Sequence, residues 1–327
     1  MTRYRFTLLR AGEFRLDAGS MFGLIPRSVW SRTVPTDERN RVTLQHNCLL
    51  LRAVNSDGRR ATGGAGSILI EAGTGNKLDE KSRDLFAMDG RSILDGLREE
   101  GVDPASIAAV IPSHLHFDHA GGLTRLAQAG ETPDWTGPAS SFGAPRGDHG
   151  VKLAFPNAEV ITQRREWEDA LANRSVMTRT YFADHLEPIR GKVRLVDSPP
   201  PFAPGIVPER DARPTWPQDV RETEVRPGVF VFRVPGHTWG QQSVRFEDEA
   251  GRSVVFTPDV LPTAWHVGQA YSLGYDVEPY TSSVTRGWLL AEAAERGWVL
   301  CLDHEPGNPL RRVRRNGKGW FDLEEVG

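Results

Sequence analysis

A short run of histidines and one aspartate constrains this chain more than any other feature. It places His114, His116, Asp118 and His119 within six positions, just before a diglycine. Neutral imidazole nitrogen and carboxylate oxygen are ligands that Zn²⁺ accepts at about 2.0–2.2 Å, and a catalytic site needs only three protein ligands per ion. The run therefore predicts a metal site, and it holds enough ligands to serve two ions.

The segments on either side of this run predict where the ligands lie. Residues 107–111 form a short apolar stretch whose length and flanks suit a buried strand, so the ligands are expected where a strand ends. After them, the diglycine at 121–122 lets the backbone turn close to the metals. Residues 123–127 are then typical of a short helix.

Three more ligand-type residues follow apolar, strand-like stretches further along the chain. They are His237, Asp259 and His304, and His237 is also flanked by glycines at 236 and 240. Each of them alone would be an ordinary loop residue. Their repeated position after a strand predicts that four strands carry their last residues to one edge.

The remaining pattern is that of an α/β enzyme. Ser92 suits the N-cap of a helix that Gly101 ends, and Asn316-Gly317 predicts a hairpin turn. Residues 198–219 hold seven prolines and predict an ordered loop or a flexible insertion. Further strands are predicted at 48–53, 67–71 and 158–162 and further helices at 165–171 and 285–295, with turn residues 55–58 and glycine-rich 62–66 joining the first two strands as a hairpin.

Composition limits the classes of partner. With a formal net charge of -3, the 327-residue chain has no broad basic field for nucleic acid, so a small neutral or amphiphilic substrate fits better. The N-terminus lacks an apolar segment with a cleavage site, and no run approaches a membrane span. We therefore expect a cytoplasmic protein with no membrane partner, in which Cys48 and Cys301 are buried free thiols.

Three other histidines lie outside these ligand motifs. His46 lies in a strand-like context and is expected to be a structural histidine with satisfied hydrogen bonds. His149 lies beside Asp148 in a segment rich in Pro, Gly and Ser, and it is interpreted as a solvated loop residue. His266 follows Asp259 and is predicted to lie near the substrate.

Together these motifs resemble those of the metallo-β-lactamase superfamily. The matching motifs, in chain order, are Ser-His-Leu-His-Phe-Asp-His-Ala-Gly-Gly at 113–122, Pro-Gly-His-Thr at 235–238, Asp259 and His304. The similarity covers most of the chain and resembles a branch of hydrolases related to the N-acyl-homoserine lactonases and the methyl-parathion-type hydrolases. The proline-rich segment 198–219 is its chief departure.

Two smaller departures concern loops near the ligand motifs. Glu71-Ala72-Gly73 stands where Asp-Thr-Gly is commoner, and Trp239 and Gln241 replace the usual Pro and His. Neither departure touches a ligand position, so the resemblance still implies metal binding, with an altered pocket shape.

The resemblance implies a single α/β domain over residues 1–327, built as a four-layer αβ/βα sandwich of two mixed β-sheets flanked by helices. It also implies two Zn²⁺ per chain, with Mn, Fe or Co as possible replacements. The implied ligands are His114, His116 and His237 for the first ion and Asp118, His119 and His304 for the second, with Asp259 bridging both.

The implied activity is hydrolysis of a small ester, foremost a lactone, by attack of a metal-bridging hydroxide. Asp118 would orient this nucleophile and return a proton to the leaving group. In the lactonases a tyrosine assists at the substrate oxygen; Tyr181, Tyr271 and Tyr275 are candidates here. A homodimer is a possible assembly.

Several alternatives are weighed against this interpretation. Hydrolysis of a phosphotriester or of another carboxylic ester would use the same metals and differ only in the pocket walls, so both stay open. A transfer-RNA-processing nuclease is disfavoured by the acidic charge balance and by the absence of an obvious basic RNA-binding arm. Flavodiiron redox chemistry is disfavoured by His116, because that branch has a carboxylate there. A scaffold without activity is disfavoured by the complete set of seven ligands.

Overall fold

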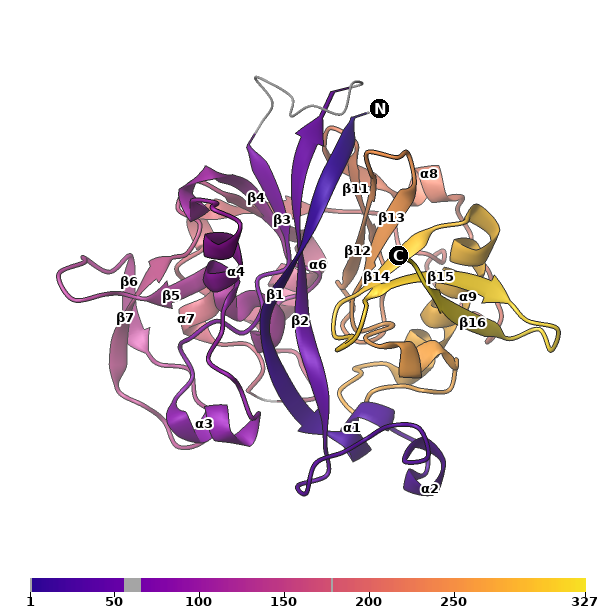
Figure 1. Cartoon of the computed structure of the whole chain (residues 1–327), viewed down its shortest axis with the longest axis horizontal. Helices are drawn as coiled ribbons and strands as arrows, with labels where there is room; N and C mark the ends of the chain where they lie inside the picture. Colours follow the sequence, from indigo (N-terminus) through magenta and orange to yellow (C-terminus); the bar gives the residue numbers. More distant parts are fainter. Residues whose placement is uncertain (1, 56–65, 178) are drawn as a thin grey trace. The chain divides into compact units, whose positions relative to one another are not determined.

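Two mixed β-sheets, one in each of two units of the chain, carry the elements that position the candidate site (Figure 1). The computed structural model describes residues 2–55, 66–177 and 179–327. We call Arg5–Arg15 with Gln45–Leu195 the N-terminal unit, and Met1–Tyr4 with Leu16–Leu44 and Val196–Gly327 the C-terminal unit.

The sheet of the N-terminal unit has the strand order β1-β2-β3-β4-β8-β9. Its β2 and β3 pair antiparallel, whereas β3, β4 and β8 run parallel, so the sheet is mixed. The strands are β1 (Arg3–Asp17), β2 (Arg41–Val54), β3 (Ser67–Ile70), β4 (Ile107–Ile111), β8 (Glu159–Gln163) and β9 (Val193–Val196).

Helices α4 (Ile93–Glu99) and α6 (Arg164–Leu171) form one core with this sheet. Ile93 and Leu97 of α4 and Trp167 of α6 belong to the same buried cluster as Leu69 and Val110 of the strands. The predicted N-cap of α4 is confirmed, because Ser92 forms a capping box with Asp95. This cluster anchors β4, the strand that leads into the histidine run.

A small sheet with the order β5-β7-β6 completes the N-terminal unit. Residues 123–127 do not form the predicted helix, because Thr124 pairs with Leu153 in this sheet and its carbonyl accepts a hydrogen bond from Lys77 Nζ at 2.9 Å. The elements are β5 (Thr124–Leu126), β6 (Trp135–Pro138), β7 (Asp148–Leu153), α3 (Glu80–Leu85), α5 (Phe117–Ala120), α7 (Ala183–Leu186), η1 (Pro104–Ser106), η2 (Gly121–Leu123) and η3 (Arg190–Lys192).

The sheet of the C-terminal unit runs from β10 to β16 in sequence order and is antiparallel except for the parallel pair β13–β14. Val284 and Trp288 of the long helix α9 lie in one buried cluster with Val255 and Leu300 of that pair. The elements are β10 (Thr223–Arg226), β11 (Val229–Arg233), β12 (Gln242–Glu247), β13 (Ser253–Thr257), β14 (Val299–Leu302), β15 (Leu310–Arg315), β16 (Phe321–Glu325), α1 (Ala18–Phe22), α2 (Arg27–Trp30), α8 (Gln218–Arg221), α9 (Pro279–Arg296) and η4 (Ala264–Val267).

The proline-rich segment 198–219 belongs to the C-terminal unit and carries only the start of α8 as regular structure. Thr215 donates its backbone N–H to the carbonyl of Pro201 at 2.8 Å, and the hydroxyl of Tyr280, on α9, donates to the carbonyl of Pro208 at 2.9 Å. These hydrogen bonds favour the ordered loop over the flexible insertion.

The predicted fold class is confirmed as a mixed α/β structure with two mixed sheets and helices. The hairpin of β2 and β3 is antiparallel as predicted, although most of its predicted turn, at 56–65, lies outside the described residues. The hairpin of β15 and β16 is also confirmed. The single domain over 1–327 stays a prediction. Among the residues described, no helix is long and apolar enough to cross a membrane.

Candidate metal centre

The first set of candidate ligands follows β4 in the N-terminal unit. After Ile111 the chain passes through His114 and enters the one-turn helix α5 at Phe117, with His116 as its N-cap residue. The His116 carbonyl accepts hydrogen bonds from the backbone N–H groups of His119 and Ala120, at 3.0 and 2.9 Å. This turn therefore brings Asp118 and His119 back beside the first two histidines.

The diglycine after the run is required by a close approach of two backbone segments. A Cβ on Gly122 would lie 2.0 Å from the carbonyl oxygen of Ala72, and a Cβ on Gly121 would lie 2.1 Å from that of Thr74. Contacts this short are forbidden, so only glycine fits at both positions. The loop after β3 is thereby held directly against the histidine run.

Side-chain partners orient two of these histidines through their Nδ1 atoms. His114 Nδ1 lies 3.0 Å from Ser113 Oγ, and His119 Nδ1 lies 3.3 Å from Glu71 Oε2. The other oxygen of Glu71 accepts the backbone N–H of Ser113 at 2.8 Å. A partner at Nδ1 fixes the ring so that Nε2 is the atom available to a metal, which is the usual arrangement around protein metal sites.

A second buried carboxylate, Glu166 on α6, supports the same loop. It accepts the backbone N–H of Leu115 at 3.0 Å and the hydroxyl of Tyr181 at 3.3 Å. Because Leu115 lies between two candidate ligands, α6 helps to fix the path of the histidine run. Burial and the Glu166 carboxylate raise the pKa of Tyr181, so its hydroxyl stays protonated as a donor.

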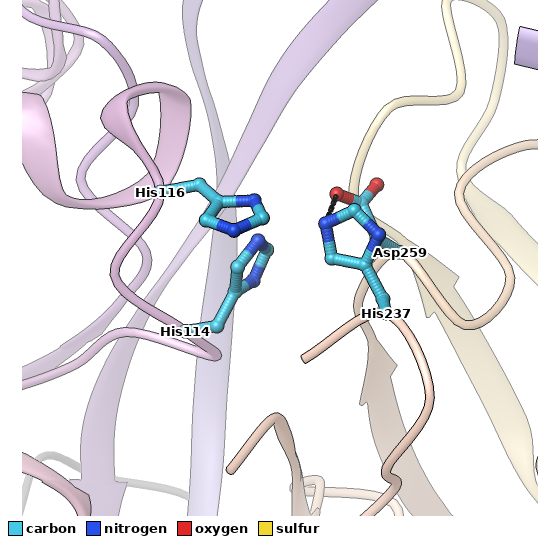
Figure 2. A group of neighbouring side chains, drawn as sticks. All are labelled: His114, His116, His237 and Asp259. Carbon is cyan, nitrogen blue, oxygen red and sulfur yellow. Dashed lines mark ion pairs between the residues drawn. The ribbon is translucent and has the colours of Figure 1, made fainter. Parts of the chain in front are cut away.

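The second set of candidate ligands lies in the C-terminal unit, beginning with His237 after β11. Its Nε2 lies 3.0 Å from Asp259 Oδ2, an ion pair that the dashed line in Figure 2 marks, and its Nδ1 lies 3.0 Å from Asp276 Oδ1. The second oxygen of Asp276 accepts the backbone N–H of Leu273 at 3.1 Å. Asp276 thus orients His237 as Glu71 orients His119.

Two neighbouring strands supply the remaining ligands of this unit. Asp259 follows β13, and His304 follows β14; His304 Nε2 lies 3.4 Å from Asp259 Oδ1. The backbone N–H of His304 donates to the carbonyl of Pro262 at 3.0 Å. Since β13 and β14 are parallel and adjacent, their carboxyl ends bring these two side chains together.

The electrostatics of this set favour a bound cation. Burial lowers the pKa of His237, but the carboxylates of Asp259 and Asp276 outweigh it and raise that pKa to about 10. A pocket that draws a proton so strongly onto an imidazole carries an excess of buried negative charge. Such charges are stable in a protein interior when they are paired or bind a metal.

All seven predicted ligands are buried, from 0 % exposed for His114 to 7 % for Asp118. Within the N-terminal unit, candidate ligand atoms of His114 and His116 lie within 4.8 Å of each other, and Asp118 Oδ2 lies 3.8 Å from His119 Nε2. The donors are imidazole nitrogens and carboxylate oxygens, which suits zinc and other divalent transition metals. The residues present therefore fit a metal centre.

Three carboxylates near these ligands are not among the residues predicted from the sequence. Asp303 precedes His304 and belongs with Asp259 and His304 to one group whose ligand atoms lie within 4.8 Å of one another. Asp276 lies in an irregular segment that gives no signal in the sequence, and Glu71 stands out in the sequence only as a departure from a motif. The position of Asp303 at a predicted strand end was a signal that could have identified it.

The three predicted substrate residues lie in different surroundings. His266 is fully buried and stacks on Phe22; its Nδ1 lies 2.8 Å from Thr263 Oγ1, and its Nε2 lies 2.8 Å from the carbonyl of Met21. Both ring nitrogens are thus engaged by the protein, which gives His266 a structural role; its contact with substrate stays a prediction.

The two tyrosines also remain predictions as substrate residues. The Tyr181 ring centroid lies 5.1 Å from that of His116. Tyr275 is partly buried and directly precedes Asp276, the partner of His237. Tyr181 is therefore close in space to a candidate ligand, and Tyr275 is next in the chain to the residue that orients one.

The structure also shows the surroundings of His46 and His149. His46 is a structural histidine as expected, since its nitrogens lie 2.8 Å from the carbonyl of Gly12 and 2.9 Å from Thr74 Oγ1. The interpretation of His149 as a solvated loop residue is wrong. It lies on β7, and its Nε2 is 2.9 Å from Oδ2 of the buried Asp184, a partner 35 positions away that only the tertiary structure supplies.

Comparison with known proteins places these features in a wider group. The family model described as the metallo-beta-lactamase superfamily matches residues 41–304. An N-acyl homoserine lactonase of Bacillus thuringiensis is 26% identical over 294 residues, which are 88% of each chain.

Solved structures share the same fold. A probable metal-dependent hydrolase from Staphylococcus aureus aligns with a TM-score of 0.73 and 23% identity, over 99% of this chain and 98% of that one. A dizinc quorum-quenching lactonase in complex with a product aligns with a TM-score of 0.68 and 15% identity, over 100% of this chain and 98% of that one.

Proposed function

Because this chain belongs to the metallo-beta-lactamase superfamily and is a hydrolase of that family, we propose that it is a dinuclear zinc enzyme that opens the ring of a lactone. The observation that carries the proposal is the placement of buried ligand-type side chains where β4, β11, β13 and β14 end. The lactonase relative, similar over 88% of both chains, supports the choice of a lactone among small esters.

The proposed ligands are the seven residues that the sequence motifs supply. His114, His116 and His237 would hold the first ion, and Asp118, His119 and His304 the second, with Asp259 shared. When bound, such a pair of ions supplies an activated water at neutral pH and polarises the carbonyl of the substrate. The buried carboxylates and the Nδ1 partners of the histidines are the chain's contribution to holding these ligands in place.

Asp118 is proposed as the residue that moves a proton. Its carboxylate lies at the N-terminal turn of α5, with Oδ2 at 3.8 Å from His119 Nε2. We assign it to accept a proton from the attacking water and to deliver it to the ring oxygen that leaves as the lactone opens. This is general acid–base catalysis by one carboxylate acting in both directions.

Substrate contacts are proposed for residues beside the ligands. The hydroxyl of Tyr181, protonated at neutral pH, would donate to a substrate oxygen after leaving Glu166, and Tyr275 would line the site beside His237. His266, in the segment that follows Asp259, would lie near the substrate. A homodimer and a cytoplasmic location belong to the same proposal.

Metal analysis and a hydrolysis screen test this function. Protein purified without chelator is expected to hold two divalent ions per chain and to hydrolyse N-acyl homoserine lactones with a higher kcat/KM than simple carboxylic esters or aryl phosphotriesters. A His237→Ala variant should lose on the order of 1000-fold in kcat/KM, about 4 kcal/mol of transition-state stabilisation. Higher activity on phosphotriesters would replace the lactone by that substrate class, and fewer than one ion per chain would reject the enzyme model.

A further inference from the structure

Asp303 is a buried carboxylate at the end of β14 that the family resemblance does not assign. It is 1 % exposed, and its backbone N–H donates to the carbonyl of Thr257, the last residue of β13, at 3.2 Å. This hydrogen bond places Asp303 at the same strand ends that carry Asp259 and His304. Its position is therefore set by the sheet.

The distances around Asp303 fit a shared cation. The ligand atoms of Asp259, Asp303 and His304 all lie within 4.8 Å of one another. His304 Nε2 is 3.4 Å from Asp259 Oδ1 and 3.7 Å from Asp303 Oδ2. Ligands bound to one ion at about 2.0–2.2 Å are separated by about 3–3.6 Å in four- or five-coordinate arrangements, so the two separations measured from His304 Nε2 are close to those within one coordination sphere.

A hydrogen bond does not account for the same geometry. At 3.7 Å, the distance from Asp303 Oδ2 to His304 Nε2 is too long for a hydrogen bond between the two side chains. In addition, an Nε2 atom that binds a metal has no proton to donate. Asp276 provides the contrast, since it lies 3.0 Å from the Nδ1 of His237 and so acts on the side of the ring away from the proposed metal.

The next carboxylate in the chain has protein partners of a different kind. Glu305 accepts the backbone N–H of Ala264 at 2.7 Å and lies 3.5 Å from the guanidinium of Arg311. Its charge is thus balanced by a cationic side chain and a backbone donor. Glu305 is as close to His304 in the chain as Asp303 but belongs to no group of candidate ligands among the described residues, which makes it a matched control.

We propose that Asp303 is a further protein ligand of the second metal ion, joining Asp118, His119, Asp259 and His304. The inference rests on the proposed dinuclear centre and deepens it. With three carboxylates and two imidazoles, the second position has more oxygen ligands than the resemblance implies. Oxygen ligands suit harder divalent ions, so Asp303 raises affinity at the second position more for Mn²⁺ than for Zn²⁺.

Metal titration of the purified, metal-free full-length chain tests the assignment without using activity. Binding of Mn²⁺ is followed by electron paramagnetic resonance and binding of Zn²⁺ by competition with a chromophoric chelator, for the wild type, Asp303→Asn, Asp303→Ala and Glu305→Gln. We expect both Asp303 variants to bind the second equivalent of Mn²⁺ about 10- to 100-fold more weakly, to lose less than that for Zn²⁺, and to bind the first equivalent unchanged. Glu305→Gln should stay within about twofold of the wild type in this comparison.

The outcomes separate this inference from the proposed function. Wild-type affinity for the second equivalent in both Asp303 variants would overturn the role of Asp303 and leave the dinuclear centre standing. A wild type that binds fewer than two ions would overturn the dinuclear centre itself, and Asp303 with it. If the variants fail to fold, a crystal structure of the metal-loaded wild type decides: an Asp303 oxygen within about 2.4 Å of an ion supports the assignment, and a longer distance rejects it.

Discussion

At the scale of single residues, three candidate histidine ligands are oriented by side chains of different chemistry. A serine hydroxyl, a glutamate and an aspartate face the Nδ1 atoms of His114, His119 and His237. Glu71 reaches its histidine from a backbone with φ of 68°, a region that side chains other than glycine rarely adopt. Such strain persists where the surroundings over-determine it, and here both carboxylate oxygens of Glu71 face the histidine run.

His266 gives a prediction about acid stability. Burial is the largest cause that lowers its pKa, to about 3, and the nearby charge of Arg286 lowers it further. The ordinary pKa of about 6.5 returns on unfolding, so the unfolded chain takes up a proton first as the pH falls. The free energy of unfolding therefore decreases as the pH falls below 6.5. Between pH 6.5 and 4, His266 accounts for a decrease of about 3 kcal/mol.

Urea unfolding of the metal-free protein between pH 4 and 7.5 measures this effect. His266→Gln and His266→Asn, which do not titrate, should be less stable than the wild type at pH 7.5 because they lose a stacked ring and one hydrogen bond. The difference should shrink as the pH falls. A constant difference across this range would contradict the buried neutral imidazole.

At the scale of elements, the site is built where strands end and one loop presses on another. The loop after β3 lies against the diglycine so closely that the Gly122 N–H donates to the Gly73 carbonyl at 2.8 Å. Lys77, in the same loop, donates hydrogen bonds from its ammonium group to the carbonyls of Gly121 and Thr124. These hydrogen bonds tie the two loops together.

This packing predicts a large cost for a single methyl group. Gly122→Ala would place its Cβ 2.0 Å from the Ala72 carbonyl oxygen, so the two loops would have to separate. We expect a loss of about 3 kcal/mol in the free energy of unfolding, measured in urea on the metal-free protein.

Gly191→Ala is the matched control for that variant. Its added Cβ would meet no atom within 4 Å, and its backbone is compatible with alanine. Its stability should stay within about 0.5 kcal/mol of the wild type. Equal stability of the two variants would show that the close approach at Gly122 is absent in solution.

At the scale of the whole molecule, the proposed ligands are spread along the chain from His114 to His304. A metal that binds only the folded chain stabilises it by mass action, with about 4 kcal/mol for each ion present at 1000 times its dissociation constant. Removal of both ions should therefore lower Tm by about 10 °C or more.

Scanning calorimetry before and after dialysis against a chelator measures this shift. Zn²⁺ or Mn²⁺ should restore the original Tm, whereas Mg²⁺, which prefers octahedral oxygen sites with retained waters, should not. The single-domain prediction further implies one transition in the metal-loaded protein. An unchanged Tm after complete removal of metal would contradict ligation across the chain.

The sequence alone was enough to predict the chemistry of the candidate ligands and the strands that lead into them. Apolar stretches before His114, His237, Asp259 and His304 are local signals, because buried strands and the residue types that bind metals are both visible in short windows. The cap of α4 at Ser92 and the C-terminal hairpin are local in the same sense. These features required no knowledge of distant contacts.

Only the tertiary structure decided which distant side chains meet. Thr124 lies in a strand because Leu153 pairs with it, His149 is held by Asp184, and Asp276 reaches His237 from 39 positions away. Asp303 joins Asp259 because two parallel strands end side by side. Such partners are chosen by packing and pairing between segments remote in the chain, and no local pattern of residues records that choice.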